Sequence, residues 1–105
     1  MKYQVRVRRL AERDLEATED WYNDQRPGLG DEFRQTIDEL FARLASNPRI
    51  YPQVHHQVRR AVLRRFPYLI YFLIDDTRVI ILAVLDSRRG PESHRRRTTG
   101  AETAR

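Results

Sequence analysis

The sequence contains no cysteine, one lysine and only four glycines, and each shortage narrows what the chain can be. Without cysteine there is no disulfide, thiol nucleophile or thiolate zinc site, which fits a reducing cytoplasm. No glycine-rich phosphate loop is present. The apolar runs are far shorter than the roughly 20 residues that a membrane helix needs, and no apolar signal segment opens the chain. At 105 residues, we expect one cytoplasmic domain without a membrane segment.

Positive charge is concentrated in the C-terminal half and is carried by arginine. Residues 1–57 hold 9 basic and 10 acidic side chains, whereas residues 58–105 hold 11 arginines and 5 acidic side chains. The single lysine is Lys2, so 19 of the 20 cations are arginine, whose planar fork suits phosphate and carboxylate groups. A GC-rich genome also enriches arginine, but it does not explain the difference between the halves. The charge pattern indicates an acidic or polyanionic partner.

The strongest β-forming character lies between residues 58 and 85. Residues 67–74 and 79–85 are rich in β-branched and aromatic side chains, and Asp75-Asp-Thr77 between them suits a tight reversal, so we predict an antiparallel hairpin. Neither strand alternates apolar with polar residues, so both faces of the sheet need a cover. Directly before them stand four arginines within seven residues: Arg59, Arg60, Arg64 and Arg65. Strand alternation would place Arg60 and Arg64 on one face and Arg59 and Arg65 on the other.

The N-terminal part predicts a strand followed by two helices. Apolar and polar residues alternate over residues 3–8, as in a half-exposed edge strand. Helical periodicity follows over about residues 10–22, where we interpret Trp21 and Tyr22 as core anchors. After Pro27-Gly-Leu-Gly30, a second apolar stripe from Phe33 to Leu44 predicts a helix capped by Gly30 or Asp31. The short turn makes the pair an antiparallel hairpin that covers one face of the sheet.

The remaining segments are predicted to be irregular. Residues 50–57 read as a loop, and its His55-His56 pair lacks the neighbouring ligands of a metal site, so we expect no metal and no cofactor. Residues 92–105 form a basic tail with few apolar residues, which we predict to be disordered. The domain therefore spans residues 1–91, and one sheet face is left uncovered.

The order and spacing of these residues resemble the RelE/ParE superfamily of bacterial type II toxin–antitoxin toxins, in particular its ParE-like, plasmid stabilisation branch. The resemblance covers about residues 3–91 and is carried by Ala11, Asp14 and Leu15, Trp21-Tyr22, Pro27-Gly-Leu-Gly30 with Phe33, Asn47-Pro48, Val58-Arg59-Arg60, Arg65-Phe66-Pro67-Tyr68, Tyr71, Ala83-Val-Leu85, Arg88-Arg89 and Pro91.

The resemblance implies an α/β (α+β) fold, with an N-terminal strand, an antiparallel helical hairpin and a three-stranded antiparallel meander in a mostly antiparallel sheet. It also implies a cognate antitoxin that wraps the toxin as a helix or an added strand, in a toxin–antitoxin hetero-oligomer. The uncovered sheet face and the sheet edge are expected docking sites for such a segment.

Two mechanisms compete within the superfamily. RelE-like members cut mRNA on the ribosome and need proton-transfer groups, for which Asp86, His94, Tyr68 and Tyr71 are the candidates. Asp86 stands where many relatives carry histidine, and a carboxylate is a poor acid there. ParE-like members poison DNA gyrase without being enzymes, which needs only a binding surface. Because no clear acid–base pair is evident, the sequence slightly favours the gyrase poison and leaves the enzyme question open.

The expected target- or antitoxin-binding residues are basic or aromatic side chains of the C-terminal half: Arg59, Arg60, Arg64, Arg65, Tyr68, Tyr71, Arg88 and Arg89. A third hypothesis is a nucleic-acid-binding or interaction module without toxicity. A neighbouring reading frame that encodes an acidic amphipathic C-terminus would favour the toxin hypotheses over this one.

Overall fold

The computed structural model describes residues 2–103, with side chains through residue 98, and forms one sheet between helices. The chain runs from β1 (Gln4–Val7) to α1 (Arg9–Gln25), α2 (Leu29–Ser46), a 3₁₀ turn (Pro48–Ile50), β2 (Gln53–His55), β3 (Val58–Val62), β4 (Tyr68–Asp75), β5 (Arg78–Asp86) and α3 (Pro91–Thr103). The sheet order is β1-β5-β4-β3-β2. Only β1 runs parallel to its neighbour, β5, so the predicted mostly antiparallel sheet is confirmed.

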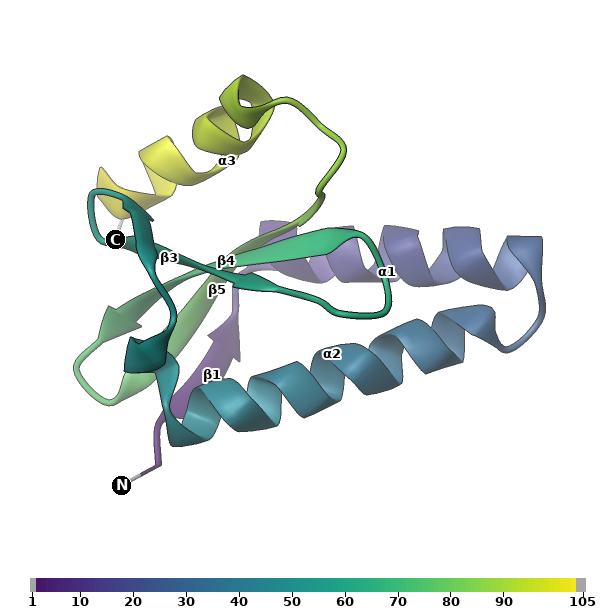
Figure 1. The fold of residues 1–105 in the computed structure, drawn as a ribbon, viewed down its shortest axis with the longest axis horizontal. Coiled ribbons are helices and arrows are strands. Elements are labelled where there is room, and N and C mark those ends of the chain that lie inside the picture. The colour runs from purple at the N-terminus through teal and green to yellow at the C-terminus, as the bar shows by residue number, and fades with distance from the viewer. Residues whose placement is uncertain (1, 104–105) are drawn as a thin grey trace.

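The helical hairpin and the central β-hairpin follow the sequence patterns. In Figure 1, α1 and α2 lie antiparallel on one side of the sheet. The turn between them is built on Gly28, whose φ of 91° is one that glycine adopts without strain. Asn23 Oδ1 accepts hydrogen bonds from the Gly28 and Gly30 amides at 3.2 and 2.7 Å. The cap of α2 thus comes from an asparagine near the end of α1, whereas the prediction of Gly30 or Asp31 as the cap was wrong.

The two faces of the sheet carry separate apolar clusters. Towards α1 and α2 lies the main core, whose fully buried members include Leu15, Phe33, Ile37 and Phe72. On the opposite face a smaller cluster contains Val58, Tyr71, Leu73, Leu82, Ala83 and Leu85. Both faces are covered, as the apolar strands require.

Besides the cap of α2 and the sheet face that was expected to be uncovered, three further expectations from the sequence were wrong. Residues 53–55, predicted as part of a loop, form β2, which extends the meander by one strand. Trp21 is 54% exposed, whereas Tyr22 beside it is buried as predicted. The predicted disorder from residue 92 is contradicted by α3, which lies on the second sheet face (Figure 1); residues 104 and 105 lie outside the described part of the chain.

Polar contacts hold α3 in place, which explains why an apolar pattern did not reveal it. His94 and Thr98 are buried at 5% and 0% exposure and stand four residues apart, on one face of the helix. The His94 ring contacts β4 and β5, Thr98 contacts β2, and Arg97 forms an ion pair with α1. Within residues 2–103, no helix is long and apolar enough to cross a membrane.

Candidate functional site

The four neighbouring arginines, Arg59, Arg60, Arg64 and Arg65, lie in different surroundings in the structure. Arg59 and Arg60 point to opposite faces of β3, as strand alternation predicts. The Arg59 guanidinium lies on the side of the helical hairpin and donates to the carbonyl oxygens of Arg49 and Tyr51 at 3.1 and 2.6 Å. Because β3 ends at Val62, the other two arginines lie in the connection to β4 and not in the strand. The prediction that Arg60 and Arg64 share a strand face was therefore wrong.

Arg65 fastens this connection to α2. Its guanidinium forms an ion pair with Glu32, which also pairs with Arg26. The hydrogen bond from Arg65, followed by the positive charges of Arg65 and Arg26, lowers the pKa of the Glu32 carboxyl below its usual value. Arg64 is exposed and lines a separate pocket of about 360 Å³ against α2. Of the four arginines, only Arg60 faces α3.

A pocket of about 280 Å³ lies between the second sheet face and α3, and we call it the arginine pocket. It brings together three of the predicted site residues, Arg60, Tyr71 and Arg89. The described residues that line it are Val54, His55, Arg60, Leu69, Tyr71, Ser87, Arg89, Pro91, His94 and Arg95. None of these ten residues is acidic, so the described lining presents cationic, neutral polar and apolar groups only.

The proton-carrying side chains of this pocket are engaged with the protein. The Tyr71 hydroxyl and His94 Nδ1 are 2.7 Å apart, and His94 Nε2 is 2.9 Å from the main-chain oxygen of Asp86. A carbonyl oxygen can only accept, so Nε2 carries the proton and Nδ1 accepts from Tyr71. His55 Nε2 lies 2.6 Å from Thr98 Oγ1. Because Tyr71 and His94 are also buried, the geometry of the pocket suits proton transfer poorly.

The end of β5 forms a second, tightly paired group. Asp86 accepts three hydrogen bonds from Arg88, one from its amide and two from its guanidinium, at 2.7–2.9 Å. These bonds lower the pKa of the Asp86 carboxyl to about 2. Asp86 is therefore ionised near neutral pH and cannot donate a proton, which excludes it as the general acid.

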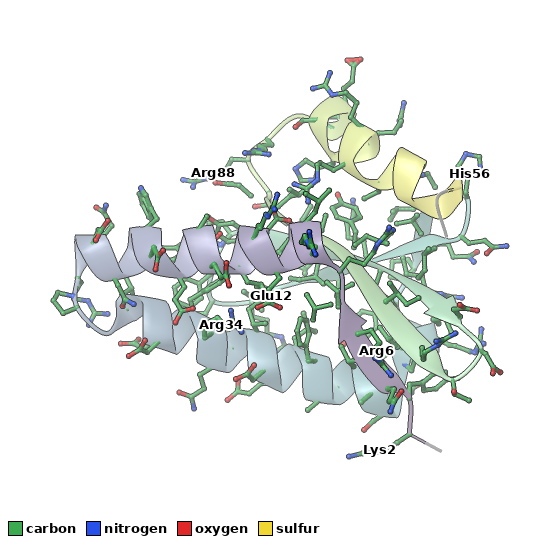
Figure 2. The ribbon with its side chains drawn as sticks, turned by 180° about the vertical axis from the view of Figure 1, so that it is seen from behind. Lys2, Arg6, Glu12, Arg34, His56 and Arg88 are labelled. Atoms are coloured by element: carbon green, nitrogen blue, oxygen red, sulfur yellow. The ribbon has the colours of Figure 1, made fainter. Side chains whose placement is uncertain are left out.

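Two further predicted site residues, Tyr68 and Arg88, lie away from the arginine pocket. Tyr68 packs against Tyr22, and burial together with Tyr68 raises the pKa of the Tyr22 hydroxyl. Tyr68 lines a smaller pocket of about 230 Å³ between α1 and the end of β5, with Asp14, Ala17, Thr18, Val84, Leu85, Asp86, Arg89 and Arg97. Arg89 lines both pockets, so they are neighbours. Figure 2 shows Arg88 at this side of the molecule, near the connection that leads into α3.

The pairing of Asp86 with Arg88 predicts a pH dependence of stability. The folded-state pKa is lowered, so the pair stabilises the fold above the unfolded-state pKa near 4 and this contribution is lost as the pH falls through about 2. We expect Asp86→Asn to cost about 1 kcal/mol at pH 6, a small value because Arg88 is 72% exposed. Thermal unfolding of the two proteins should converge between about pH 4 and pH 2. A difference that persists unchanged at the low end would exclude this ion pair as its cause.

Several residues at this site were not predicted from the sequence. His55 and Arg95 line the arginine pocket, and Asp14 and Arg97 join α1 to α3. A signal for α3 existed in the sequence, since Pro91 and Glu92 suit a first helical turn and His94 and Thr98 have helical spacing. It was weak because this spacing involves polar residues.

Comparisons with known proteins bear on this arrangement. A family model described as ParE toxin of type II toxin–antitoxin system, parDE, matches residues 5–91. A solved structure described as the chromosomal ParDE TA system from P. aeruginosa is 24% identical over 81% of this chain and 96% of that chain, with a TM-score of 0.72. The toxin–antitoxin complex RelBE2 from Mycobacterium tuberculosis is 26% identical over 82% and 99%, with a TM-score of 0.58. Comparison with curated proteins gives no match. The family match ends at Pro91, so most of α3 lies beyond it.

Proposed function

Because the chain belongs to the ParE toxin family of type II toxin–antitoxin systems, we propose that it poisons DNA gyrase and that a cognate antitoxin neutralises it. The family match includes three residues of the arginine pocket: Arg60 of β3, Tyr71 of β4 and Arg89, which follows the end of β5. A gyrase poison needs a surface that binds the enzyme or its DNA, and it needs no acid–base pair of its own.

The observation that carries the proposal is the state of the groups in the arginine pocket. Its two buried proton-carrying side chains, Tyr71 and His94, are bonded to each other, and the second ring nitrogen of His94 is used by a main-chain oxygen. Arg60 and Arg89 line the same pocket as cations. Both ring nitrogens of His94 are thus occupied, and two guanidinium groups line the same pocket. This arrangement supports binding of an anionic surface more than it supports proton transfer.

An apolar stripe on α1 supports the antitoxin part of the proposal. Leu10 and Trp21 are each 54% exposed, and Ala17 lies on the same helix face between them. The small pocket beside Ala17 and Thr18 adjoins this stripe. Exposed apolar side chains next to a pocket suit an amphipathic segment of a partner, and both similar solved structures are described as toxin–antitoxin systems or complexes. We infer that the antitoxin covers this face of α1.

Ribosome-dependent mRNA cleavage is the second candidate. It is favoured by one observation, the presence of His55, Tyr71 and His94 in the same pocket as the arginines. For this chemistry α3 would have to shift, because His94 is only 5% exposed and has no ring nitrogen available for a substrate.

A gyrase cleavage assay tests the proposal directly. We expect the purified chain, added to gyrase, ATP and supercoiled plasmid, to trap cleaved complexes, so that linear DNA accumulates after treatment with detergent and protease. Addition of the antitoxin encoded beside the toxin gene should abolish this signal. In cells, induction of the chain should reduce incorporation of labelled thymidine before that of labelled amino acids.

The opposite order in cells, together with cut mRNA on purified ribosomes and no trapped gyrase, would replace the proposal with the ribonuclease. Chain that leaves both incorporations unchanged would instead be a non-toxic interaction module.

A further inference from the structure

We propose that the arginine pocket holds a backbone phosphate of DNA, so that the chain contacts the nucleic acid directly when it acts on gyrase. The choice of DNA rests on the proposed function. The site itself is inferred from three observations: two arginines form no side-chain hydrogen bond among the described residues, the described lining contains no acidic residue, and α3 begins at the rim.

The guanidinium groups of Arg60 and Arg89 are not held by hydrogen bonds to the described part of the protein, although the positive charge of Arg89 lies near enough to Asp86 to help lower the pKa of that carboxyl. Among the described residues, neither forms a side-chain hydrogen bond or ion pair, whereas Arg59, Arg65, Arg88 and Arg97 each bind an oxygen of the protein. Arg60 is moreover half-buried in β3, where its charge is less well solvated than at the open surface. A partly desolvated cation that forms no ion pair in the protein can bind an anion without first breaking one.

The walls of the pocket suit an anion that enters from solvent. Its rim is formed by exposed residues, Ser87, Arg89, Pro91 and Arg95, and its floor by buried Tyr71 and His94. Pro91 is the first residue of α3, so the positive end of the helix dipole lies at the rim. The acidic residue of the first turn, Glu92, is exposed and does not line the pocket. Phosphate oxygens accept hydrogen bonds from guanidinium groups, from the amides of a helix N-terminus and from hydroxyl groups.

The distribution of charge favours a polyanion over a single acidic side chain. Residues 58–105 carry 11 arginines and 5 acidic residues. Arg95 and Arg96 add exposed charge along α3, next to the pocket. A nucleic-acid strand presents phosphates at regular spacing and can reach the pocket and this helix together, with affinity gained from counter-ion release.

Fluorescence anisotropy with a labelled DNA duplex of about 20 base pairs, measured between about 50 and 200 mM salt, tests the site. The pocket variant is Arg60→Gln/Arg89→Gln. Its matched control is Arg9→Gln/Arg13→Gln, which removes the same charge from two exposed positions of α1. Circular dichroism establishes that each variant is folded.

We expect the pocket variant to bind DNA about tenfold more weakly than the unmodified chain and to reduce the slope of log affinity against log salt by about 1, because one phosphate contact is lost. The control should change affinity by less than about twofold. Equal losses in both variants, or no DNA binding by the unmodified chain at the lowest salt, would overturn the proposal. A stronger affinity for single-stranded RNA of the same sequence would overturn the assignment to DNA.

The anisotropy experiment contains no gyrase, so its result does not depend on whether the proposed function is correct. DNA binding that requires the pocket, without trapped gyrase, would refute the gyrase proposal and leave the phosphate site standing. Trapping of gyrase by a pocket variant as efficient as the unmodified chain would refute the phosphate site and leave the gyrase proposal standing.

Discussion

Replacement of Phe33 by alanine is expected to lower the free energy of unfolding by about 3–5 kcal/mol, the largest effect that we expect from a single core substitution. Phe33 is fully buried in α2. Its ring lies 5.5–5.7 Å, centroid to centroid, from those of Tyr22, Phe66 and Tyr68. These partners belong to α1, the β3–β4 connection and β4, so one ring joins three parts of the fold. Thermal unfolding followed by circular dichroism should show a midpoint lower by more than about 10 °C.

Phe41→Ala is the matched control, because it removes the same ring from the same helix at a position that is only partly buried. We expect a loss below about 2 kcal/mol there, since less apolar surface returns to water. If the two substitutions cost the same, the aromatic cluster around Phe33 would contribute no more than ordinary burial, and the interpretation of this core would be wrong.

The sequence predicted the main core well where the helical stripe was unambiguous. Phe33, Ile37, Leu40 and Leu44 are all buried, as their spacing in α2 requires. In α1 two apolar stripes run side by side, one through Leu10 and Trp21 and the other through Leu15 and Tyr22. Periodicity alone does not say which stripe faces the sheet, and the second does. The exposed Trp21 is therefore a surface feature that only the packed structure distinguishes from the core.

The positions of the four neighbouring arginines could be predicted only in part. Alternation in β3 correctly separated Arg59 from Arg60, because that rule depends only on neighbouring positions. It failed for Arg64 and Arg65, because no residue type marks the end of the strand at Val62. Arg65 and Arg59 are held away from Arg60 by partners in other segments, Glu32 in α2 and the carbonyl oxygen of Tyr51. Long-range pairing of this kind leaves no periodic signal.

The helix α3 was not predicted because polar contacts replace an apolar face. Its buried residues are a histidine and a threonine, whose partners come from β2, β4 and β5. Composition therefore indicated disorder, although the fold supplies a partner for each of these groups. The sheet face that was expected to be open for an antitoxin is covered in part by α3. The exposed apolar stripe of α1 is therefore the surface that we assign to the antitoxin.

Asp14→Ala should release α3 and cost about 2–4 kcal/mol, because Asp14 serves three elements at once. Its carboxylate accepts from the Val84 amide in β5 at 3.0 Å and from Arg97 in α3 at 3.1 and 2.8 Å. Strand β1 ends at Val7, opposite Ile81, so it does not reach the Val84 amide. Alanine would leave this amide and the Arg97 guanidinium without their acceptor, in a region where Arg97 Nε already has no partner.

Asp14→Asn separates the two roles, since its side-chain oxygen can still accept from Val84 while the charge that holds Arg97 is removed. We expect it to cost about half as much as alanine in urea unfolding, and to speed hydrogen exchange of the amides in α3 nearly as much. Faster exchange confined to α3 in both variants would confirm that the ion pair holds the helix over the arginine pocket. If α3 exchanged at the original rate in both, His94 and Thr98 alone would account for its position, and Asp14 would serve only the edge of β5.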